Sequence, residues 1–543
     1  VAGVTAQGAY AVAIGGSAGN ANQNTHATAV GYTAGTNAQG TYATAVGYEA
    51  GSSAQADSAT AVGYAAGKTN QGTQSVAVGK QAAQVSQGSS AVAVGYLAGY
   101  NAQGNNGVAV GYNAGQNSQG AQSVAVGYYT GSGDQGVSSV AIGREAAQNS
   151  QGDNSVAIGY IAGSGSQGTQ SVAVGYAAGK VSQGNQSVAI GHYAGYNAQG
   201  ADSVAIGREA GCSSQSAQGV AIGRNTAQLS QGSEAVAIGY YAGYNVQGAA
   251  SVAVGQQAAQ HDQGSGSVAI GLYAGSTTQG NNAIAVGVNA GYNAQGVNAT
   301  AVGNSAGCAD QGAQAVAIGI GAAQNAQGND SVAIGYVAGS ANQGTSAVAV
   351  GFYAGYNAQG IESVAVGLAA AQVSQGAYSV AVGRYAGCNV QGTHSVAVGN
   401  QAGFASQGTK SVAIGYLAGL NAQGNNCVAV GDQAGSADQG LQSVAVGYVA
   451  AEVSQGTYAT AVGGFAGYNA QGSQAVALGN AAAQVSQGNN AVAIGHVAGQ
   501  NSQGAQAVAV GLAAGRNAQG SNSIAVGYDA GNVSQPASSF YVS

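Results

Sequence analysis

The sequence predicts an all-β fold, a parallel β-solenoid or β-roll made of 33 coils of 16 residues each. The first observation is a glycine register that runs from Gly15 through Gly31 to Gly527 without an insertion or deletion. The second is a short run in each copy with β-branched residues two apart, which is typical of a strand. The third is that charged residues are confined to a few positions of the repeat. Self-similarity at a short fixed period indicates a stacked solenoid, in which each unit buries its apolar face against its neighbours.

One repeat reads Ser-Val-Ala-Val/Ile-Gly-Tyr-x-Ala-Gly-x-Asn-x-Gln-Gly-x-x, and its residues are numbered positions 1 to 16 below. A chain of 543 residues would ordinarily form several domains, but the unbroken register predicts one β-solenoid repeat domain over 1–535. Residues 536–543, which begin with the only proline, are expected to form a C-terminal cap or linker. The chain starts at Val1 without an initiator Met or a signal peptide, so we expect a mature form or an excised segment.

The composition excludes several classes of protein. Lys and Arg number 9 against 16 Asp and Glu, a net charge of −7, which argues against nucleic-acid binding. There is no run of about 18 apolar residues, so no transmembrane helix is predicted. The low charge and the abundance of Gln, Asn, Ser and Ala are typical of low-complexity disorder, but the strict Val/Ile positions favour a folded chain.

Positions 1 to 5 are predicted to form a short strand, as in residues 75–79. Because side chains alternate across a strand, positions 2 and 4 share one face, which we assign to the lumen of the coil together with Ala at position 8. Position 3 is Ala and position 5 is Gly in all 33 copies, which indicates the close approach of another backbone. The position-3 face is therefore predicted to be the interface between chains, represented by Ala13, Ala77, Ala237 and Ala525.

Position 13 is Gln in every full or partial copy of the repeat. A Gln on the surface would vary, whereas amides stacked at one-coil spacing can hydrogen-bond along the solenoid, as they do in cross-β stacks. A structural ladder is therefore predicted inside the coil. Its representatives are Gln39, Gln87, Gln215, Gln311, Gln423 and Gln535.

The tyrosines are the best candidates for contact with a partner. Most of the 30 tyrosines occupy positions 6, 7 or 10, and position 6 also accepts Lys, Arg, His and Asp, so it is expected to be exposed. Rows of exposed Tyr offer amphipathic contact area; the alternative is that the rings only cover the coil edge and stack on the next coil. The candidate contact residues are Tyr32, Tyr96, Tyr100, Tyr160, Tyr196, Tyr240, Tyr244, Tyr292, Tyr336, Tyr356 and Tyr468.

The string Ser-Val-Ala-Ile-Gly-x-x-Ala at residues 155–162 and 331–338 resembles the head repeat of YadA-like trimeric autotransporter adhesins, and similar repeats occur in phage and viral fibres. The resemblance covers essentially the whole chain. It implies a left-handed parallel β-roll, assembled as a trimeric rod with the small-residue face at the three-fold axis and an adhesive exterior. The unit here is longer than the usual one, with a longer turn around Asn-x-Gln-Gly. No heptad stalk, neck or membrane-anchor strands are visible in the sequence.

No catalytic or metal constellation can be assembled, so the sequence predicts a protein that is not an enzyme and has no cofactor or metal. The five histidines lie on different coils. Cys212, Cys308 and Cys388 share position 10 but are five or six coils apart, roughly 24 and 29 Å, too far for a disulfide. Cys427 takes position 1. Free thiols are predicted, with links between chains as the alternative.

Three functions compete. The first is an extracellular structural or adhesive fibre at a cell or virion surface, which forms a homotrimer and binds matrix, glycans or a cell surface by repeated weak contacts. The second is a subunit of a self-assembling filament or sheath, or of a viral or phage fibre. The third and weakest is a monomeric ice-binding solenoid, because such a protein needs regular Thr ranks and Thr is scattered here.

Overall fold

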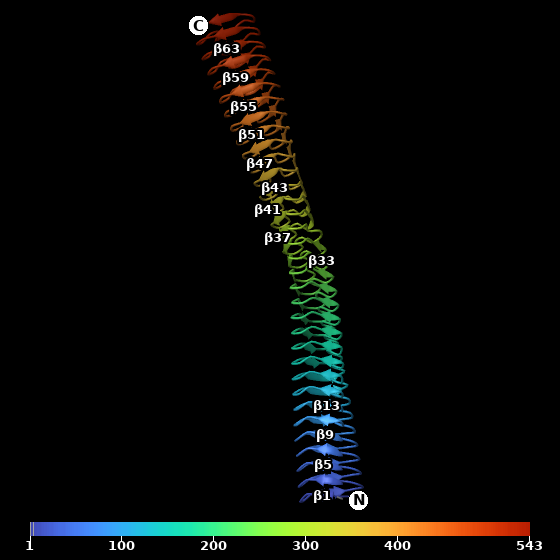
Figure 1. Cartoon of the computed structure of the whole chain (residues 1–543). Coiled ribbons are helices and arrows are strands. Elements are labelled where there is room, and N and C mark those ends of the chain that lie inside the picture. The colour runs from blue at the N-terminus through green and yellow to red at the C-terminus, as the bar shows by residue number, and fades with distance from the viewer. Residues whose placement is uncertain (1, 4) are drawn as a thin grey trace. The chain divides into compact units, whose positions relative to one another are not determined.

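The computed structural model describes residues 2–3 and 5–543 and contains two compact units, Val1–Ile270 and Gly271–Ser543. The described residues form strands, bridges, turns and bends, and none of them lies in a helix of the length and apolarity that crossing a bilayer requires. In each unit the chain winds in coils of 16 residues, and equivalent strands of successive coils lie one above another (Figure 1). The predicted all-β parallel solenoid is therefore confirmed. Its left-handed sense, its trimeric state and its domain boundary at 535 stay predictions.

The first strand of each coil covers positions 2 to 4 and recurs every 16 residues, from β2 (Val12–Ile14) to β65 (Ile524–Val526). Within each unit, each strand pairs in parallel with its equivalent in the next coil, as β10 (Val76–Val78) does with β12 (Val92–Val94). The backbone groups of this β-branched run therefore bond to the coils above and below, which satisfies them without an antiparallel partner. Two strands of the row extend to position 6: β16 (Val124–Tyr128) and β18 (Val140–Arg144).

The second strand of most coils ends on the Gln of position 13 and covers positions 11 to 13 or only 12 and 13, whereas the coils of Gln295 and Gln535 have only isolated bridges there. Examples are β5 (Asn37–Gln39), β7 (Ser53–Gln55) and β11 (Ser86–Gln87). These strands also pair in parallel and in register, with Asn37 opposite Ser53 and Gln39 opposite Gln55. Most coils thus contribute one strand to each of two parallel rows, and two turns, at positions 5 to 10 and 14 to 16, join the rows at opposite edges.

The invariant glycine at position 5 is required by the next coil of the same chain. Gly271 has a φ of +128°, which side chains with a Cβ rarely adopt. A Cβ added there would lie 2.6 Å from the carbonyl oxygen of Gly287, one coil further. The prediction that another backbone approaches position 5 is right about the distance. It is wrong about the source, because the backbone belongs to the neighbouring coil and not to a second chain.

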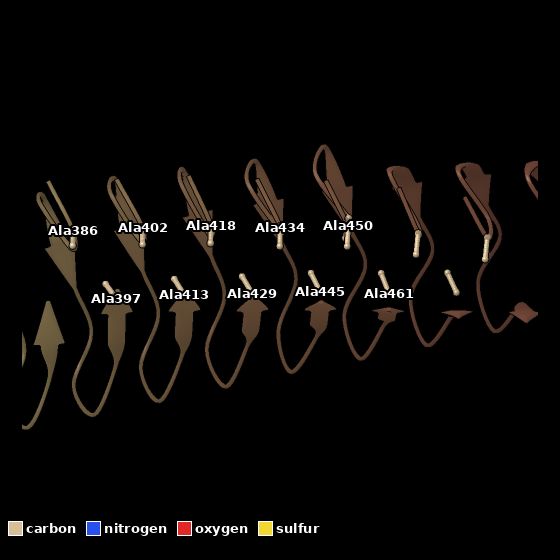
Figure 2. Packing of buried hydrophobic residues seen from close by; sticks show 14 of the residues in the cluster. Ala386, Ala397, Ala402, Ala413, Ala418, Ala429, Ala434, Ala445, Ala450 and Ala461 are labelled. Carbon is tan, nitrogen blue, oxygen red and sulfur yellow. The ribbon is translucent and has the colours of Figure 1, made fainter. Parts of the chain in front are cut away.

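The alanines of position 3 line the interior of the coil. Ala397, Ala413 and their equivalents point toward the position-8 alanines Ala402 and Ala418, and the two rows meet between the sheets (Figure 2). The position-3 alanines from Ala29 to Ala525 are fully buried within a single chain. The interior is narrow: a Cβ added at Gly35 would lie 3.2 Å from the Cβ of Ala29 and 2.9 Å from the amide carbon of Gln39.

The assignment of the two faces of the first strand is therefore wrong. Ala77, Ala237 and Ala525 are 0% exposed in the single chain, and Ala13 in the first coil is partly buried against the same alanine core. These residues are not available to a partner chain. The reason is steric, because two sheets held together by alanine contacts and stacked glutamines leave no room for Val or Ile between them.

The β-branched residues of positions 2 and 4 instead point outward and form an apolar stripe along the outer face of the first sheet. In the single chain they are half-buried to exposed. We call the positions 2 and 4 of all coils the apolar stripe. Its exposed position-4 members in the first unit include Val94, Ile142, Ile158, Ile190, Ile238 and Ile270.

The residues after Pro536 continue the path of the solenoid. The last strand, β66 (Phe540–Val542), pairs in parallel with β65, and Phe540 lies opposite Ile524. Gln535 still occupies the interior, where its Nε2 donates to the carbonyls of Ile524 and Ser539. From residue 536 the side chains therefore depart from the repeat, while the backbone continues along the path of the coil.

Candidate functional site

The turn at positions 5 to 10 carries most of the tyrosines, and we call its residues at positions 6, 7 and 10 the aromatic edge. Position 6 follows the glycine that ends the first strand, so its side chain leaves the coil at the rim. Among the predicted contact residues, Tyr32 is 56% exposed and Tyr160 is 37% exposed. Tyr240, Tyr292 and Tyr336 are also exposed. Tyrosine hydroxyls and ring edges are thus open to a partner along this edge.

The position-6 rings of the first unit stack on one another. Successive ring centroids are 5.4 Å apart for Tyr32 and Tyr48 and 5.1 Å apart for Tyr48 and Tyr64. A second run joins Tyr96 to residues 112 and 128, with centroids 4.9 and 5.1 Å apart. A third run joins Tyr160 to residues 176 and 192, at 5.1 and 4.9 Å. The parallel register of the coils sets this spacing, since equivalent residues repeat at one-coil intervals.

Cations connect the three runs into one column. The Nζ of Lys80 lies 5.9 Å from the ring centroid of Tyr64 and 5.7 Å from that of Tyr96. The guanidinium of Arg144 lies 5.7 Å from Tyr128 and 5.4 Å from Tyr160. These are cation–π distances. Position 6 of the first unit therefore forms an unbroken column from Tyr32 to His192, which we call the aromatic column.

The cations and His192 were not among the predicted contact residues. Their signal was present in the sequence, because position 6 accepts Tyr, Lys, Arg and His alike. Aromatic and cationic side chains can alternate in one stack, and this alternation only becomes visible once the coils are placed in register.

Most position-10 tyrosines are less exposed than most of those at position 6, although Tyr292 is exposed. Tyr100, Tyr196, Tyr244, Tyr356 and Tyr468 are half-buried, as is Tyr96 at position 6. Edge-to-face contacts hold three of them against position-7 rings, at centroid distances of 5.0 Å for Tyr193 and Tyr196, 4.9 Å for Tyr241 and Tyr244, and 5.2 Å for Tyr353 and Tyr356. Much of the position-10 ring surface therefore covers the coil edge, as the alternative interpretation holds.

Hydrogen bonds along the edge raise the pKa of a tyrosine and of a lysine, which are ordinarily protonated at neutral pH. A bond to Tyr240 raises the pKa of Tyr241 above its ordinary value. A bond to the hydroxyl of Tyr196, 3.2 Å away, raises the pKa of the Lys180 ammonium. The aromatic edge thus presents neutral phenols and permanent cations at neutral pH.

The position-13 glutamines are buried and stacked inside the coil. Gln87 donates from Nε2 to the carbonyls of Val76 and Ala91, at 2.8 and 3.1 Å, and to Oε1 of Gln103 at 3.0 Å. One run of amide-to-amide bonds joins residues 279, 295, 311, 327, 343 and 359, and another joins residues 439, 455, 471, 487, 503 and 519. The side chain spans the interior and bonds to the backbone of the opposite sheet.

The ladder is continuous only in runs. Gln215 and Gln311 each donate to the Gln one coil further. Among the described residues, Oε1 of Gln39, Gln423 and Gln535 has no hydrogen-bond partner, and these side chains donate only to backbone carbonyls. Bonds from Gln to the backbone are therefore the constant feature of position 13, and amide-to-amide bonds are the variable one.

The thiols are not arranged for chemistry. All four cysteines are free in the single chain. Burial raises the pKa of Cys212, Cys308 and Cys388, which lowers their thiolate fraction and reactivity. Cys427 is buried at position 1. Within the part of the chain that the structure describes, no three His, Cys, Asp or Glu side chains gather closely enough to hold a metal ion.

The fold and the aromatic edge together define the class of protein. It is a repetitive β-solenoid whose exposed side chains recur at one-coil spacing along each unit. The family model of the YadA head domain repeat, in two copies, matches residues 23–50, 135–162, 150–178, 166–194, 182–210 and 391–418. The matched segments are similar to the YadA head domain repeat, as the string Ser-Val-Ala-Ile-Gly-x-x-Ala predicts, and the repeats fit an adhesin-like protein. No match was found among curated proteins.

Proposed function

We propose that this chain is part of an extracellular fibre at a cell or virion surface, that it assembles with further copies of itself into a homotrimer, and that it makes multivalent contacts through its aromatic edge. The observation that carries the proposal is the aromatic column from Tyr32 to His192, both ends of which lie in segments that match the YadA head domain repeat. Its contact partners are proposed to be extracellular matrix, glycans or a cell surface. Neither a cofactor nor a reaction enters the proposal.

The apolar stripe supports self-association. It places a β-branched residue at position 2 and Val, Ile or, once, Leu478 at position 4 on one face of the coil, with the position-4 residues of many coils more than a third exposed in the single chain. A contiguous apolar surface of this extent marks an interaction site, and covering it with the same stripe of other copies removes it from water. The apolar stripe, and not the face of the position-3 alanines, is therefore the proposed interface between chains.

Introducing one charge into the stripe is expected to weaken assembly. Ile238→Asp puts a carboxylate at position 4, where the side chain is 37% exposed in the single chain. In an assembled stripe that carboxylate would be buried without a partner, at a cost of several kcal/mol. Sedimentation velocity should show a shift of the particle mass toward the monomer.

Val246→Asp is the matched control, because Val246 lies at position 12 of the same coil on the outer face of the other sheet and is 49% exposed. It should leave the particle mass unchanged. Equal effects of the two variants would contradict the assignment of the stripe as the interface.

A filament or sheath is the second candidate, because the same stripe also permits open assembly. The homotrimer and the filament differ in how the mass of the assembled particle depends on protein concentration. A discrete particle of fixed mass over a wide concentration range supports the homotrimer, whereas mass that grows with concentration supports the filament.

Removing aromatic contact area from the aromatic edge is expected to weaken adhesion strongly. The variant Tyr32→Ser, Tyr240→Ser and Tyr336→Ser deletes three exposed position-6 rings. Since multivalent binding multiplies weak contacts, the loss of three should lower retention about tenfold or more. Retention is measured on a reconstituted basement-membrane matrix and on immobilised neutral and acidic glycans.

The control removes three equally exposed rings from the opposite edge: Tyr42→Ser, Tyr378→Ser and Tyr458→Ser at position 16. This variant should bind as the unmodified chain does. If wild-type retention on these surfaces is real and the position-6 variant keeps all of it, the aromatic edge is not the adhesive surface.

A further inference from the structure

Charge in the first unit is divided between the two opposite edges of the coil. All six Lys and Arg of residues 1–270 lie at positions 6 or 10, on the aromatic edge: Lys68, Lys80, Arg144, Lys180, Arg208 and Arg224. The turn at positions 15 and 16 carries none of them and instead bears four acids, which we call the acidic edge: Asp57, Asp153, Asp202 and Glu234. All four acidic side chains are exposed. The remaining two acids outside the aromatic edge, Asp134 and Asp262, lie at position 12.

Local ion pairs do not cancel this division. The aromatic edge also holds three glutamates, and each is paired there: Glu49 with Lys68 at 2.8 Å, Glu145 with Arg144 at 3.2 Å and Glu209 with Arg208 at 3.2 Å. The aromatic edge keeps a net charge of about +3, counted from six cations and three glutamates. Among the described residues, the four carboxylates of the acidic edge form no ion pair. Asp57 and Asp153 are held by the backbone N–H groups of Thr41 and Val137, at 2.8 and 2.7 Å.

Acids and bases also occur at matching heights along the first unit. Asp153 belongs to the same coil as Arg144, and Glu234 to the same coil as Arg224. Asp202 closes the coil before the one that holds Arg208, and Asp57 nearly closes the coil before Lys68. In three of the four matches the base is also paired with a glutamate of its own edge, whereas Arg224 forms no ion pair among the described residues. Because the chain rises by one coil, about 4.8 Å, every 16 residues, each acid lies within one coil of a base in height. The two members of each match lie on opposite edges, so they cannot meet within one chain.

A second copy placed alongside in the same direction brings them together. We propose that the acidic edge of one copy of the first unit contacts the aromatic edge of a second copy, parallel and staggered by no more than one coil. A two-fold related contact would place like edges, and hence like charges, against each other, which is unfavourable. This contact rests on the self-association proposed above. The apolar stripe supplies area, and the edges select the direction and register. Because the contact covers the aromatic edge of the first unit, the matrix contacts proposed above then fall to the aromatic edge of the second unit, where Tyr336 is exposed.

The first experiment cross-links the full-length chain with a water-soluble carbodiimide, which activates a carboxylate and lets a lysine amine displace the activator as an amide bond forms. Unlabelled and ¹⁵N-labelled chains are mixed, so that mass spectrometry separates links within a chain from links between chains. The link between Glu49 and Lys68 inside one chain is the internal control. We expect mixed-isotope links from Asp57 to Lys80 or Lys68. The contact is overturned if mixed-isotope links join only distant pairs such as Asp57 and Lys180. It is also overturned if the chain is oligomeric and gives no mixed-isotope links.

The second experiment reverses charges. Arg224→Glu places like charges opposite Glu234 of the neighbouring copy, and the dissociation constant of the assembly is expected to rise about tenfold. Glu234→Arg alone should also raise the dissociation constant of the assembly. The double variant, Arg224→Glu with Glu234→Arg, should restore assembly because the two charges are exchanged and attract again. Asp134→Arg is the control, because position 12 lies off both edges and its reversal should have little effect.

The outcomes separate this contact from the proposed function. A wild-type chain that stays monomeric in sedimentation overturns both the self-association and the edge contact. An oligomer that weakens with Ile238→Asp but is indifferent to the charge reversals and to ionic strength overturns the edge contact alone. An oligomer that responds to each single reversal and recovers in the double variant supports it.

Discussion

Gly319→Ala is expected to destabilise the coils around residue 319 by at least about 3 kcal/mol, while Gly321→Ala, two residues further on, costs about 1 kcal/mol. Both glycines lie in the second unit and both have positive φ values, +127° and +63°. The two substitutions add the same methyl group. They differ in the conformation that alanine must adopt and in what the methyl group meets.

Two effects add at Gly319. Its φ lies in a region that is essentially reserved for glycine, and an added Cβ would lie 2.8 Å from the carbonyl carbon of Gly335 and closer still to its oxygen. That carbonyl belongs to the stacked backbone of the next coil, so it cannot move aside without breaking the ladder. At Gly321 the nearest atom to an added Cβ is Cγ2 of Val337 at 3.5 Å, and other coils hold non-glycine residues at this position with similar φ.

Amide hydrogen exchange is the measurement, because a solenoid loses structure locally before it unfolds as a whole. Protection should fall in the coils next to Gly319→Ala and stay near wild-type values in Gly321→Ala. Equal protection in the two variants would show that the coils can separate at position 5, which the backbone contact in the structure does not allow.

Gln311→Glu is the second change with a large expected effect. Nε2 of Gln311 donates to the carbonyls of Thr300 and Ala315, at 2.9 and 3.3 Å, and to Oε1 of Gln327 at 3.0 Å. A carboxylate cannot donate to any of them and would face three acceptor oxygens in a buried site. We expect the free energy of unfolding at pH 7 to fall by several kcal/mol.

The loss should depend on pH in a definite direction. Burial and the surrounding acceptors favour the neutral form, so the introduced carboxyl has a folded-state pKa above its unfolded value of about 4.3. Stability is therefore greatest below the unfolded pKa, and it declines by up to about 1.4 kcal/mol per pH unit as the pH rises toward the folded pKa. Urea unfolding at pH 4 and pH 7 measures the difference.

Gln314→Glu provides the matched control, because Gln314 is exposed at position 16 of the same repeat. Its unfolding should change little between the two pH values. A Gln311→Glu variant with the same pH dependence as this control would mean that the buried amide is not needed as a donor.

Reading the sequence correctly identified the features that repeat along the chain. The register from Gly15 to Gly527 predicts the 16-residue coil, and the run of β-branched residues predicts the first strand, as β10 and its equivalents show. The invariance of Gln311 and its equivalents predicts a buried polar side chain, and Gln311 is 3% exposed. Exposed tyrosines at position 6 follow from the polar and charged residues that share this position.

The faces of the first strand could not be decided in the same way. Absence of charge marks a position as sheltered, but it does not distinguish the interior of a coil from the contact between chains. Ala77 and Val78 are both free of charge in every equivalent copy. The preference of β-branched residues for buried strand faces pointed to Val78. The better signal was the strictness of position 3, since a site that tolerates only Ala is more confined than one that accepts Val, Ile and Leu.

The sequence by itself determined the period, the strands, the invariant glycine and the buried amide, because each depends on residues that recur one coil apart on the same chain. Only the tertiary structure decided that alanine fills the interior and that Val and Ile point outward, because this depends on the distance between two sheets. It also decided that Lys80 and Arg144 join separate tyrosine runs into one column, since that contact exists only when coils stack in register. The physical reason is the same in both cases: a one-dimensional pattern specifies which residues are equivalent, whereas packing specifies how far apart they lie.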